Sequence, residues 1–420
     1  MAVWLDGFDM PAGILSDVCG SSLFEYNADY RALPHSIPLS MSLPLSESSF
    51  DCRKSQPYFA NLLHAASLAP EQLAEEKHDG LVDALKISGR DCPGAVSCAP
   101  MGEPRAKQIG DLDRDYVQID DLANLVATLA CRQLPAAMRG AESPLAGVQP
   151  KIALAIVDGV LCRPTAGAPT THVLKVQPDD TDHLADNEYA CLKLARQLGC
   201  AAVNPQRLTI AGKPCLVIPR YDRVIRDRKV YRKHQESFAQ ALGLTDKQKY
   251  EPDVARHDSE ACDARYDQSS ILALLEKVRQ PEEDRRNFLR LTLVNILLGN
   301  SDNHANNHAL AYSDGAMPEL APAFDLVALP HWPKFAFCVG RARDLASLKA
   351  EDLVRFATLT TGTAPDAARA CFSTLSDIVD RGRLAMASMV AEDSSMAGLQ
   401  DYWRARLERL GQLADELRSG

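Results

Sequence analysis

Residues 151–222 contain the pattern that most restricts how this chain can fold. The two apolar runs of KIALAIVDGVLCRP are joined by Asp158 and Gly159, a pair that favours a tight β-hairpin turn. THVLKVQ predicts a third strand, DDTDHLADNEYACLKLARQLGC a helix ended by Gly199, and KPCLVIPRYDR a further strand. The order hairpin, strand, helix, strand predicts a small sheet with one packed helix.

Different patterns flank this segment. Before it, MAVWLDG predicts a strand, HSIPLSMSLPL predicts strand material at sheet edges, and LANLVATLACRQL predicts a capped helix. After it, QESFAQALGL, EEDRRNFLRLTLVNILLGN and the last 22 residues or so read as helices, while HALAYSD and PELAPAFDL predict a short β pair. We therefore predict an α/β (α+β) chain in three parts: residues 1–140, 141–225 and 226–420.

Composition argues against several classes of protein. The chain has 420 residues, of which 46% are apolar and 24% charged, as is usual for a globular protein. The net charge of -10 argues against a broad nucleic-acid-binding face. No apolar run approaches the roughly 18 residues of a membrane span, and the N-terminus lacks the basic segment of a signal peptide. The 12 cysteines form no C-x-x-C motif, so we expect reduced thiols and a cytoplasmic protein without membrane contacts.

The stretch LLGNSDNHANNHALAYSDG, residues 297–315, allows two interpretations. His304 and His308 are four residues apart and could bind zinc from one face of a helix. The Glu of the hydrolytic H-E-x-x-H motif is absent, however, and Gly299 predicts that the helix ends before the histidines. This weakens the zinc interpretation.

Phosphoryl transfer requires other residue types, and the chain supplies them in order. Asp302 fits the base that accepts a hydroxyl proton, while Asn307 and Asp325 offer the oxygen ligands that Mg²⁺ prefers. Lys175, in the third predicted strand, would contact the nucleotide phosphates. Glu188 lies on the apolar side of the following helix, where a lone charge is costly, so we expect it to pair with Lys175. This is the order of parts found in kinases.

The same segments resemble the HipA family of bacterial toxin kinases. SPLAGVQPKIAL, THVLKV, NEYACLKLARQLG and LVIPRYDR are similar to its small-lobe motifs, and QESFAQALGL, KYE, NSDNHANNHAL and LAPAFDL to its large-lobe motifs. HSIPLSMSLPL also resembles this family, so the matches span roughly residues 35–330. The resemblance implies a two-lobed, protein-kinase-like fold with an N-terminal HipA-type subdomain, a small β-rich lobe and a mostly helical large lobe.

The resemblance also implies the roles of single residues. Asp302 is then the catalytic residue, and Asn307 and Asp325 hold Mg²⁺. The residues expected to bind ATP are Gly147, Val148, Gln149, Lys151, Lys175, Glu188, Val217, Pro219, Tyr221 and His304.

Two positions depart from the family pattern. The family commonly has an autophosphorylated Ser three residues before the loop glycine, whereas this chain has Pro144 there and Ser143 one residue earlier. Ser143 is therefore the candidate autophosphorylation site. In the hinge strand, Pro219 replaces a common Glu. Because Pro has no N–H, a hinge donor to adenine has to come from Tyr221 or a neighbour.

The resemblance implies an ATP- and Mg²⁺-dependent serine/threonine protein kinase that inhibits translation and growth, for which glutamyl-tRNA synthetase is the family's precedent as substrate. It also implies a small helix-turn-helix antitoxin, HipB-like, through which the chain would reach DNA. Two alternatives stay open. The chain could phosphorylate a small molecule, or it could be a catalytically weak ATP-binding corepressor of the antitoxin.

Overall fold

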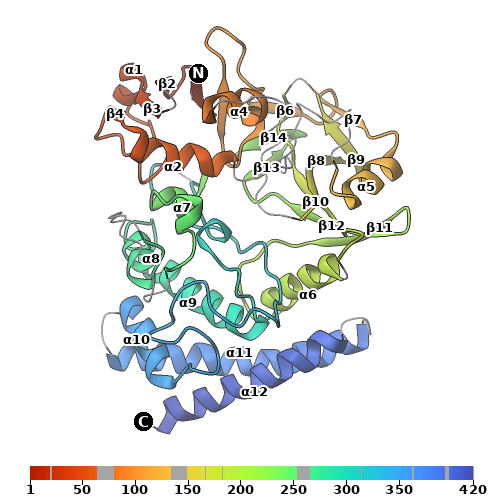
Figure 1. Cartoon of the computed structure of the whole chain (residues 1–420), viewed down its shortest axis with the longest axis vertical. Coiled ribbons are helices and arrows are strands. Elements are labelled where there is room, and N and C mark those ends of the chain that lie inside the picture. Colours follow the sequence, from red (N-terminus) through yellow and green to blue (C-terminus); the bar gives the residue numbers. More distant parts are fainter. Residues whose placement is uncertain are drawn as a thin grey trace. The chain divides into compact units, whose positions relative to one another are not determined.

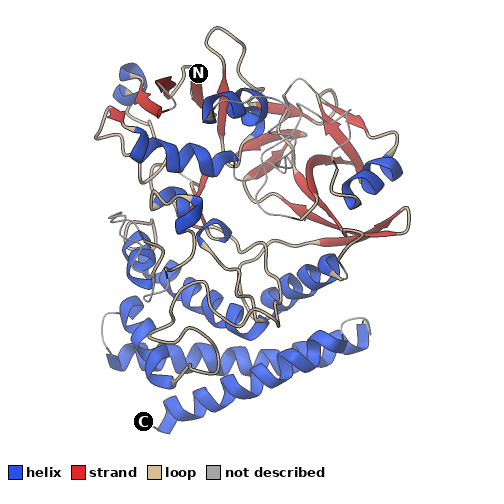
Figure 2. Ribbon diagram, viewed as in Figure 1, coloured by secondary structure: helices blue, strands red, loops and turns tan. Residues whose placement is uncertain are grey.

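The computed structural model describes residues 1–18, 21–63, 80–133, 149–165, 167–181, 183–252, 265–313, 315–361, 364–392 and 397–419. The chain forms two compact units. All described strands from β1 to β15 belong to unit 1, whereas unit 2 is mostly helical (Figure 2). Unit 1 comprises Met1–Ala185, Gln206–Asp246 and Leu310–Pro318, and unit 2 comprises Asp186–Pro205, Lys247–Ala309 and Glu319–Gly420.

Unit 1 begins with an antiparallel sheet in the strand order β4-β3-β2-β1-β5. Strands β2, β3 and β4 are labelled near the N-terminus in Figure 1. Side chains of β3 alternate between buried and exposed, as expected for a sheet with one face on a core. The strands are β1 Ala2–Leu5, β2 Gly13–Val18, β3 Ser21–Tyr26, β4 Ser49–Phe50 and β5 Val96–Ala99, and the helices are α1 Ala28–Ala32, α2 Cys52–Leu63 and α4 Leu81–Ser88.

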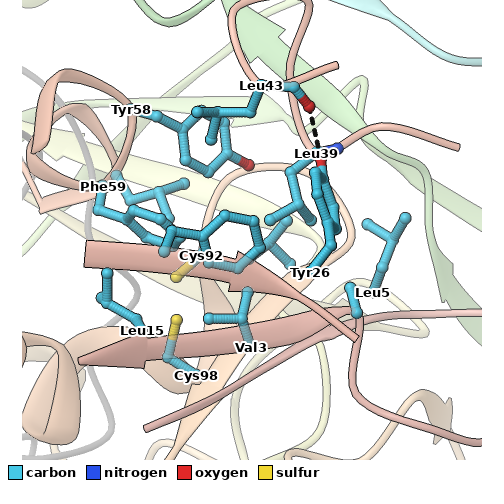
Figure 3. Packing of buried hydrophobic residues seen from close by; sticks show 14 of the residues in the cluster. Val3, Leu5, Leu15, Tyr26, Leu39, Leu43, Tyr58, Phe59, Cys92 and Cys98 are labelled. Atoms are coloured by element: carbon cyan, nitrogen blue, oxygen red, sulfur yellow. Dashed lines mark hydrogen bonds between the residues drawn. The ribbon is translucent and has the colours of Figure 1, made fainter. Parts of the chain in front are cut away.

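The core of this sheet includes a loop that we predicted as strand material (Figure 3). The Tyr26 hydroxyl donates to the carbonyl of Leu43 at 2.6 Å and accepts the Leu39 N–H at 2.8 Å. In this loop, hydrogen bonds to the Tyr26 hydroxyl take the place of backbone bonds to a neighbouring strand. The prediction of strand for residues 35–45 was therefore wrong. Pro38 and Pro44 each lack the N–H that a ladder requires.

The second sheet of unit 1 contains the predicted hairpin and has the order β11-β12-β10-β8-β9-β7. Asp158 and Gly159 have φ angles of 50° and 83°, as a type I′ turn requires, so the hairpin prediction is confirmed. Helix α5, Leu122–Ala130, packs its apolar side on this sheet and is capped by Asp121. The strands are β7 Tyr116–Gln118, β8 Lys151–Val157, β9 Val160–Pro164, β10 His172–Val176, β11 Gln206–Ile210 and β12 Lys213–Pro219.

The rest of unit 1 is built of short strands. Only part of QESFAQALGL is helical, because its first three residues form β15 and Ser237 then caps a single turn of helix with Gln240. The elements are β6 Ile109–Asp111, β13 Arg223–Arg226, β14 Lys229–Arg232, β15 Gln235–Ser237 and α7 Phe238–Ala241.

Unit 2 contains long helices, and α9 is packed against the last three of them. Pro281 occupies the first turn of α9 together with three acidic residues, which favour a helix start. Within the described residues, none of the helices combines the length and apolar character needed to cross a membrane. The helices are α6 Leu184–Gln197, whose first two residues belong to unit 1, α8 Gln268–Leu275, α9 Pro281–Leu298, α10 Ala350–Thr361, α11 Ala364–Glu392 and α12 Ala397–Ser419.

The predicted β pair after α9 is confirmed. Strands β16, Ala309–Ala311, and β17, Glu319–Leu320, are neighbours in a short sheet. The N–H of Ala321 donates to the carbonyl of Ala309 at 2.9 Å and continues this pairing. The pair separates the segment of Asp302 from the segment of Asp325 along the chain.

Candidate functional site

The loop that holds Asp302 begins where α9 ends. Gly299 adopts a left-handed conformation with φ of 70°, and its N–H donates to the carbonyl of Ile296 at 3.2 Å. This confirms the predicted helix stop after Leu298. His304 and His308 therefore lie beyond α9, on either side of a short 3₁₀ turn, Ala305–Asn307.

Three side chains hold Asp302 in this loop. The Tyr250 hydroxyl donates a hydrogen bond to the Asp302 Oδ1. Asn307 Nδ2 donates to the Asp302 carbonyl at 2.6 Å, and the Asp302 N–H donates to Asn300 Oδ1 at 3.3 Å. The carboxylate of Asp302 is thus half-buried and oriented, as a group that has to accept a proton from a bound hydroxyl would be.

The orientation of Asn307 suits a metal ligand. Its Nδ2 donates to the Asp302 carbonyl, and its Oδ1, which lies in the same amide plane on the opposite side of the Cβ–Cγ bond, therefore faces away from that carbonyl. Asp325 supplies a carboxylate from a left-handed backbone conformation, with φ of 55°, which is uncommon outside glycine and concentrates at functional sites. Amide and carboxylate oxygens are the donors that Mg²⁺ takes, usually one or two per site beside substrate phosphates. The donor set therefore fits Mg²⁺.

Helix α6 and the residues that follow α6 hold the segment around Asp325 on both of its sides. Before Asp325, the Ala323 N–H donates to the carbonyl of Ala201 at 2.7 Å. After it, Asn187 on α6 bonds both backbone groups of Ala328, at 2.8 and 2.9 Å. In the sequence, Asn187 is visible only as the first residue of the motif NEYACLKLARQLG, directly before Glu188, which is fully buried on the same helix.

Burial keeps the two histidines of the loop neutral at pH 7. Burial lowers the pKa of His304, against an opposing effect of the Asp302 carboxylate, and its ring meets the Tyr250 ring edge-on at 5.1 Å. Burial also lowers the pKa of His308 to about 3, and its ring lies 5.2 Å from that of Phe288. In the described part of the chain, no three His, Cys, Asp or Glu side chains are grouped as metal ligands would be.

In unit 1, the predicted phosphate-binding lysines are neighbours. Lys175 on β10 lies directly opposite Lys151 on β8, and both are buried. Directly opposite side chains leave the same face of a sheet, where two like charges repel each other unless an anion lies near them. The adjacent Gln149 has a buried Nε2 without a hydrogen-bond partner among the described residues. Gly147, Val148 and Ser143 lie outside the described residues.

The predicted hinge is the end of β12 and the residues that follow. Val217 and Pro219 pair with Leu174 and His172 of β10. The N–H of Arg220 donates to the carbonyl of Thr171 at 2.9 Å, so it is already used within the protein. The Tyr221 hydroxyl donates to Gln235 Oε1 at 2.8 Å.

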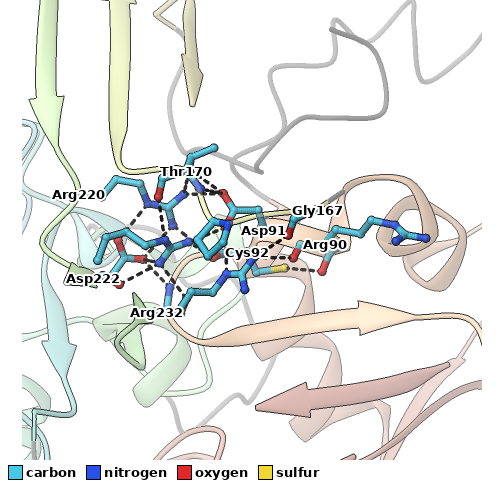
Figure 4. Close-up of polar contacts among 12 residues, drawn as sticks. Arg90, Asp91, Cys92, Gly167, Thr170, Arg220, Asp222 and Arg232 are labelled. Atoms are coloured by element: carbon cyan, nitrogen blue, oxygen red, sulfur yellow. Dashed lines mark hydrogen bonds and ion pairs between the residues drawn. The ribbon is translucent and has the colours of Figure 1, made fainter. Parts of the chain in front are cut away.

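Both arginines of the hinge segment PRYDR enter a buried ionic cluster (Figure 4). Arg220 and Arg223 bond Asp222 and also Asp91, which lies before β5 of the N-terminal sheet. Arg232 of β14 joins them at Asp91, at 3.1 Å. Asp91 is separated from Arg220 by 129 positions, so sequence patterns gave no sign that it holds the hinge segment.

The chain is similar to known proteins over both of its halves. The family models for the HipA N-terminal domain and the HipA-like C-terminal domain match residues 1–99 and 143–382. The Y4mE protein of Sinorhizobium fredii is 30% identical over 368 residues, which cover 84% of each chain. The serine/threonine-protein kinase toxin HipA of Shewanella oneidensis is 28% identical over 201 residues, 46% of this chain and 44% of that protein.

A solved structure supports the fold over the whole chain. The Shewanella oneidensis MR-1 HipA, in a complex with HipB and its operator DNA, superposes with a TM-score of 0.78 at 21% identity, covering 100% of this chain and 99% of that one. The predicted α/β, kinase-like fold is therefore confirmed. With both family domains matched in order along one sequence, this chain belongs to the HipA family of kinases.

Proposed function

We propose that this kinase transfers the γ-phosphoryl group of ATP to a Ser or Thr hydroxyl of a protein, in a reaction that depends on Mg²⁺. The observation that carries the proposal is the held carboxylate of Asp302, with the Tyr250 hydroxyl on its Oδ1 and Asn307 on its backbone. A fixed carboxylate of this kind orients an acceptor hydroxyl and takes its proton as phosphoryl transfer proceeds.

The other predicted residues take the remaining roles in this proposal. Lys175 and Lys151 offer ammonium groups to the nucleotide phosphates, and Glu188 is the predicted partner of Lys175. Val217, Pro219 and Tyr221 border adenine, and His304 supports the loop of Asp302. Asn307 and Asp325 would hold Mg²⁺, which would supply positive charge beside the β- and γ-phosphates. The division into parts at residues 140 and 225 likewise stays a prediction.

We also propose a toxin–antitoxin role. Two observations support it: the match to both HipA domains, and the solved Shewanella structure in which HipA is accompanied by HipB and operator DNA. A small HipB-like antitoxin would then be the partner of this chain, and the net charge of -10 agrees with contact to DNA through that partner. The acceptor would be a host protein, for which an aminoacyl-tRNA synthetase is the first candidate.

Radiolabelled ATP tests the proposal. The purified protein is incubated with [γ-32P]ATP and Mg²⁺, once with a pool of host proteins and once with a pool of metabolites, and Asp302→Asn is the control. Label on Ser or Thr of a protein, absent with Asp302→Asn, supports the proposal. Label confined to a metabolite would make the chain a small-molecule kinase. Stabilisation by ATP and Mg²⁺ without any transfer would make it an ATP-binding corepressor.

A second measurement addresses autophosphorylation. The protein is incubated with ATP and analysed by mass spectrometry of its peptides. We expect phosphate on Ser143, because this is the serine closest to the position used by the family. Phosphate on another residue, or on none, would contradict the assignment of Ser143 as the autophosphorylation site.

A further inference from the structure

A small pocket lies next to the loop of Asp302, within unit 2. It is formed by the last turns of α9, the start of the loop, residues 332–335, and α12. The space between its atoms is about 200 Å³, including the open mouth. The enclosed part measures only about 10 Å³, room for a single oxygen-sized atom, so any larger group has to remain partly in the open mouth.

Two buried donors in the wall of this pocket have no partner among the described residues. Asn300 Nδ2 donates to Asn295 Oδ1 at 2.9 Å, which orients the Asn295 amide and leaves Asn295 Nδ2 without an acceptor. Ser301 Oγ is also unpartnered. Asn295 and Ser301 are only 2% and 5% exposed, so bulk water does not compensate these groups. A buried donor left unpaired is destabilising, so a ligand oxygen that accepts from it is favoured.

The third polar group of the pocket is a cation. Arg406 of α12 donates its Nε to the Ile296 carbonyl at 2.7 Å, and its guanidinium lies over the Tyr402 ring, 5.1 Å from the centroid. Across the described chain, no carboxylate forms an ion pair with Arg406. Burial lowers the pKa of Arg406. The Nε bond caps the end of α9, but the two Nη groups remain available.

We propose that this pocket is an oxyanion-binding site for one phosphate group, with Arg406, Asn295 and Ser301 as its donors. A guanidinium, an amide and a hydroxyl are the donors that phosphate oxygens accept from, and the pocket lining contains no acidic side chain. The site is distinct from the predicted nucleotide-binding residues. Asn300, which bonds Asn295, also accepts the Asp302 N–H, so the site adjoins the catalytic loop.

Calorimetric titration of the full chain tests the site. Inorganic phosphate and O-phosphoserine are titrated at constant ionic strength into wild type, Asn295→Asp, Arg406→Met and Arg404→Met. Arg404 lies on the same helix but is exposed and paired with Asp401, so its variant is the matched control. Asn295→Asp keeps the oxygen that accepts from Asn300 and places a negative charge in the pocket. It therefore tests the site even if Arg406→Met, which also loses the helix cap, fails to fold.

We expect wild type and Arg404→Met to bind phosphate equally, and both pocket variants to bind at least about tenfold more weakly, the effect of one lost charge-assisted hydrogen bond. Binding of inorganic phosphate would identify a free ion as ligand. Binding of phosphoserine alone would identify a phosphoryl group carried on a side chain. If wild type binds neither, or if the pocket variants bind like wild type, the proposal is overturned. The readout is binding, so it does not depend on phosphoryl transfer.

Discussion

The hydroxyl of Tyr250 donates a hydrogen bond to Oδ1 of Asp302, from a position 52 residues earlier in the chain. The carbonyl of Lys249, the preceding residue, accepts the N–H of Ala305 at 2.9 Å, so the same segment also holds the loop backbone. Tyr250 thus positions the carboxylate to which we assign the chemistry. It was visible in the sequence only as the middle residue of KYE.

Tyr250→Phe should lower kcat with little effect on the KM for ATP. The variant keeps the ring against His304 and loses only the hydroxyl that orients Asp302. A hydrogen bond to a charged group contributes about 1.5–3 kcal/mol, which corresponds to a roughly 10-fold to 100-fold loss in kcat. Steady-state kinetics would measure it, with the exposed Tyr231→Phe as control. A wild-type kcat for Tyr250→Phe would show that the bond has no part in catalysis.

Asp91→Asn should destabilise the protein by about 3–5 kcal/mol, because it leaves buried guanidinium groups without their shared counter-ion. Denaturant unfolding measures the change. The control is Asp113→Asn, which removes the carboxylate of an exposed pair with Arg228 and should cost no more than about 1 kcal/mol. Equal effects of the two variants would contradict a structural role of the cluster.

The contribution of Asp91 should also depend on pH. Burial alone would raise the pKa of Asp91, but Arg223, Arg220 and Arg232 outweigh it and hold the pKa well below its ordinary value. The stabilisation is then complete above the unfolded-state pKa of about 3.9 and is lost as the pH falls toward the folded-state pKa. The difference in unfolding free energy between wild type and Asp91→Asn should therefore shrink below about pH 4. A constant difference would refute this assignment.

The contribution of Glu236 to stability should depend on pH in the opposite direction to that of Asp91. Burial raises its pKa from 4.5 to about 7, while hydrogen bonds from Ser40, Tyr312 and the Met41 N–H act against that rise. A raised pKa means that the folded state holds a proton which the unfolded state has already lost. The resulting stabilisation is present below about pH 4.5 and disappears as the pH rises through about 7.

Glu236→Gln removes this proton linkage and keeps an amide oxygen for Tyr312 and Met41. Relative to wild type, the variant should gain stability between pH 5 and pH 8, by up to roughly 3 kcal/mol. Urea unfolding at the two pH values would measure the gain. Glu103→Gln, at an exposed position, should show no such change. If Glu236→Gln and wild type respond identically to pH, the carboxyl is not protonated in the folded protein.

Gly299→Ala should be more destabilising than Gly212→Ala. Both glycines have positive φ, which costs an alanine about 1–2 kcal/mol. A Cβ at Gly299 would also lie 2.1 Å from the Tyr402 hydroxyl, whereas a Cβ at Gly212 has no atom within 4 Å. We expect the difference in unfolding free energy between the variants to exceed about 1 kcal/mol. If the two variants lose the same unfolding free energy, Tyr402 of α12 is not packed against Gly299 at the end of α9.

Local rules predicted much of the fold from the sequence. Asp158 with Gly159 predicted the hairpin, Gly299 the end of α9, and Asp121 the start of α5, because turn and cap preferences depend on neighbouring residues alone. Short strands were missed. β11 is largely exposed, and β13 to β15 are only three or four residues long, too short for an alternating pattern to stand out.

Contacts between distant segments could not be predicted in this way. The sequence marked Asp302, Asn307 and Asp325 by their order and spacing, and the structure describes all three. Tyr250 and Asn187, which hold Asp302 and the segment after Asp325, carry no local signature of their role. Tertiary hydrogen bonds of this kind depend on how the chain folds back, which a single sequence does not encode in any periodic pattern.

The most direct test of the central claim compares phosphoryl transfer by wild type, Asp302→Asn and the exposed Asp380→Asn in the presence of Mg²⁺ and [γ-32P]ATP. The account predicts transfer to protein Ser or Thr by wild type and Asp380→Asn, and a loss of at least about 100-fold for Asp302→Asn. Thermal stabilisation by ATP and Mg²⁺ should remain in all three proteins. Equal transfer by wild type and Asp302→Asn would contradict the assignment of Asp302 as the catalytic residue.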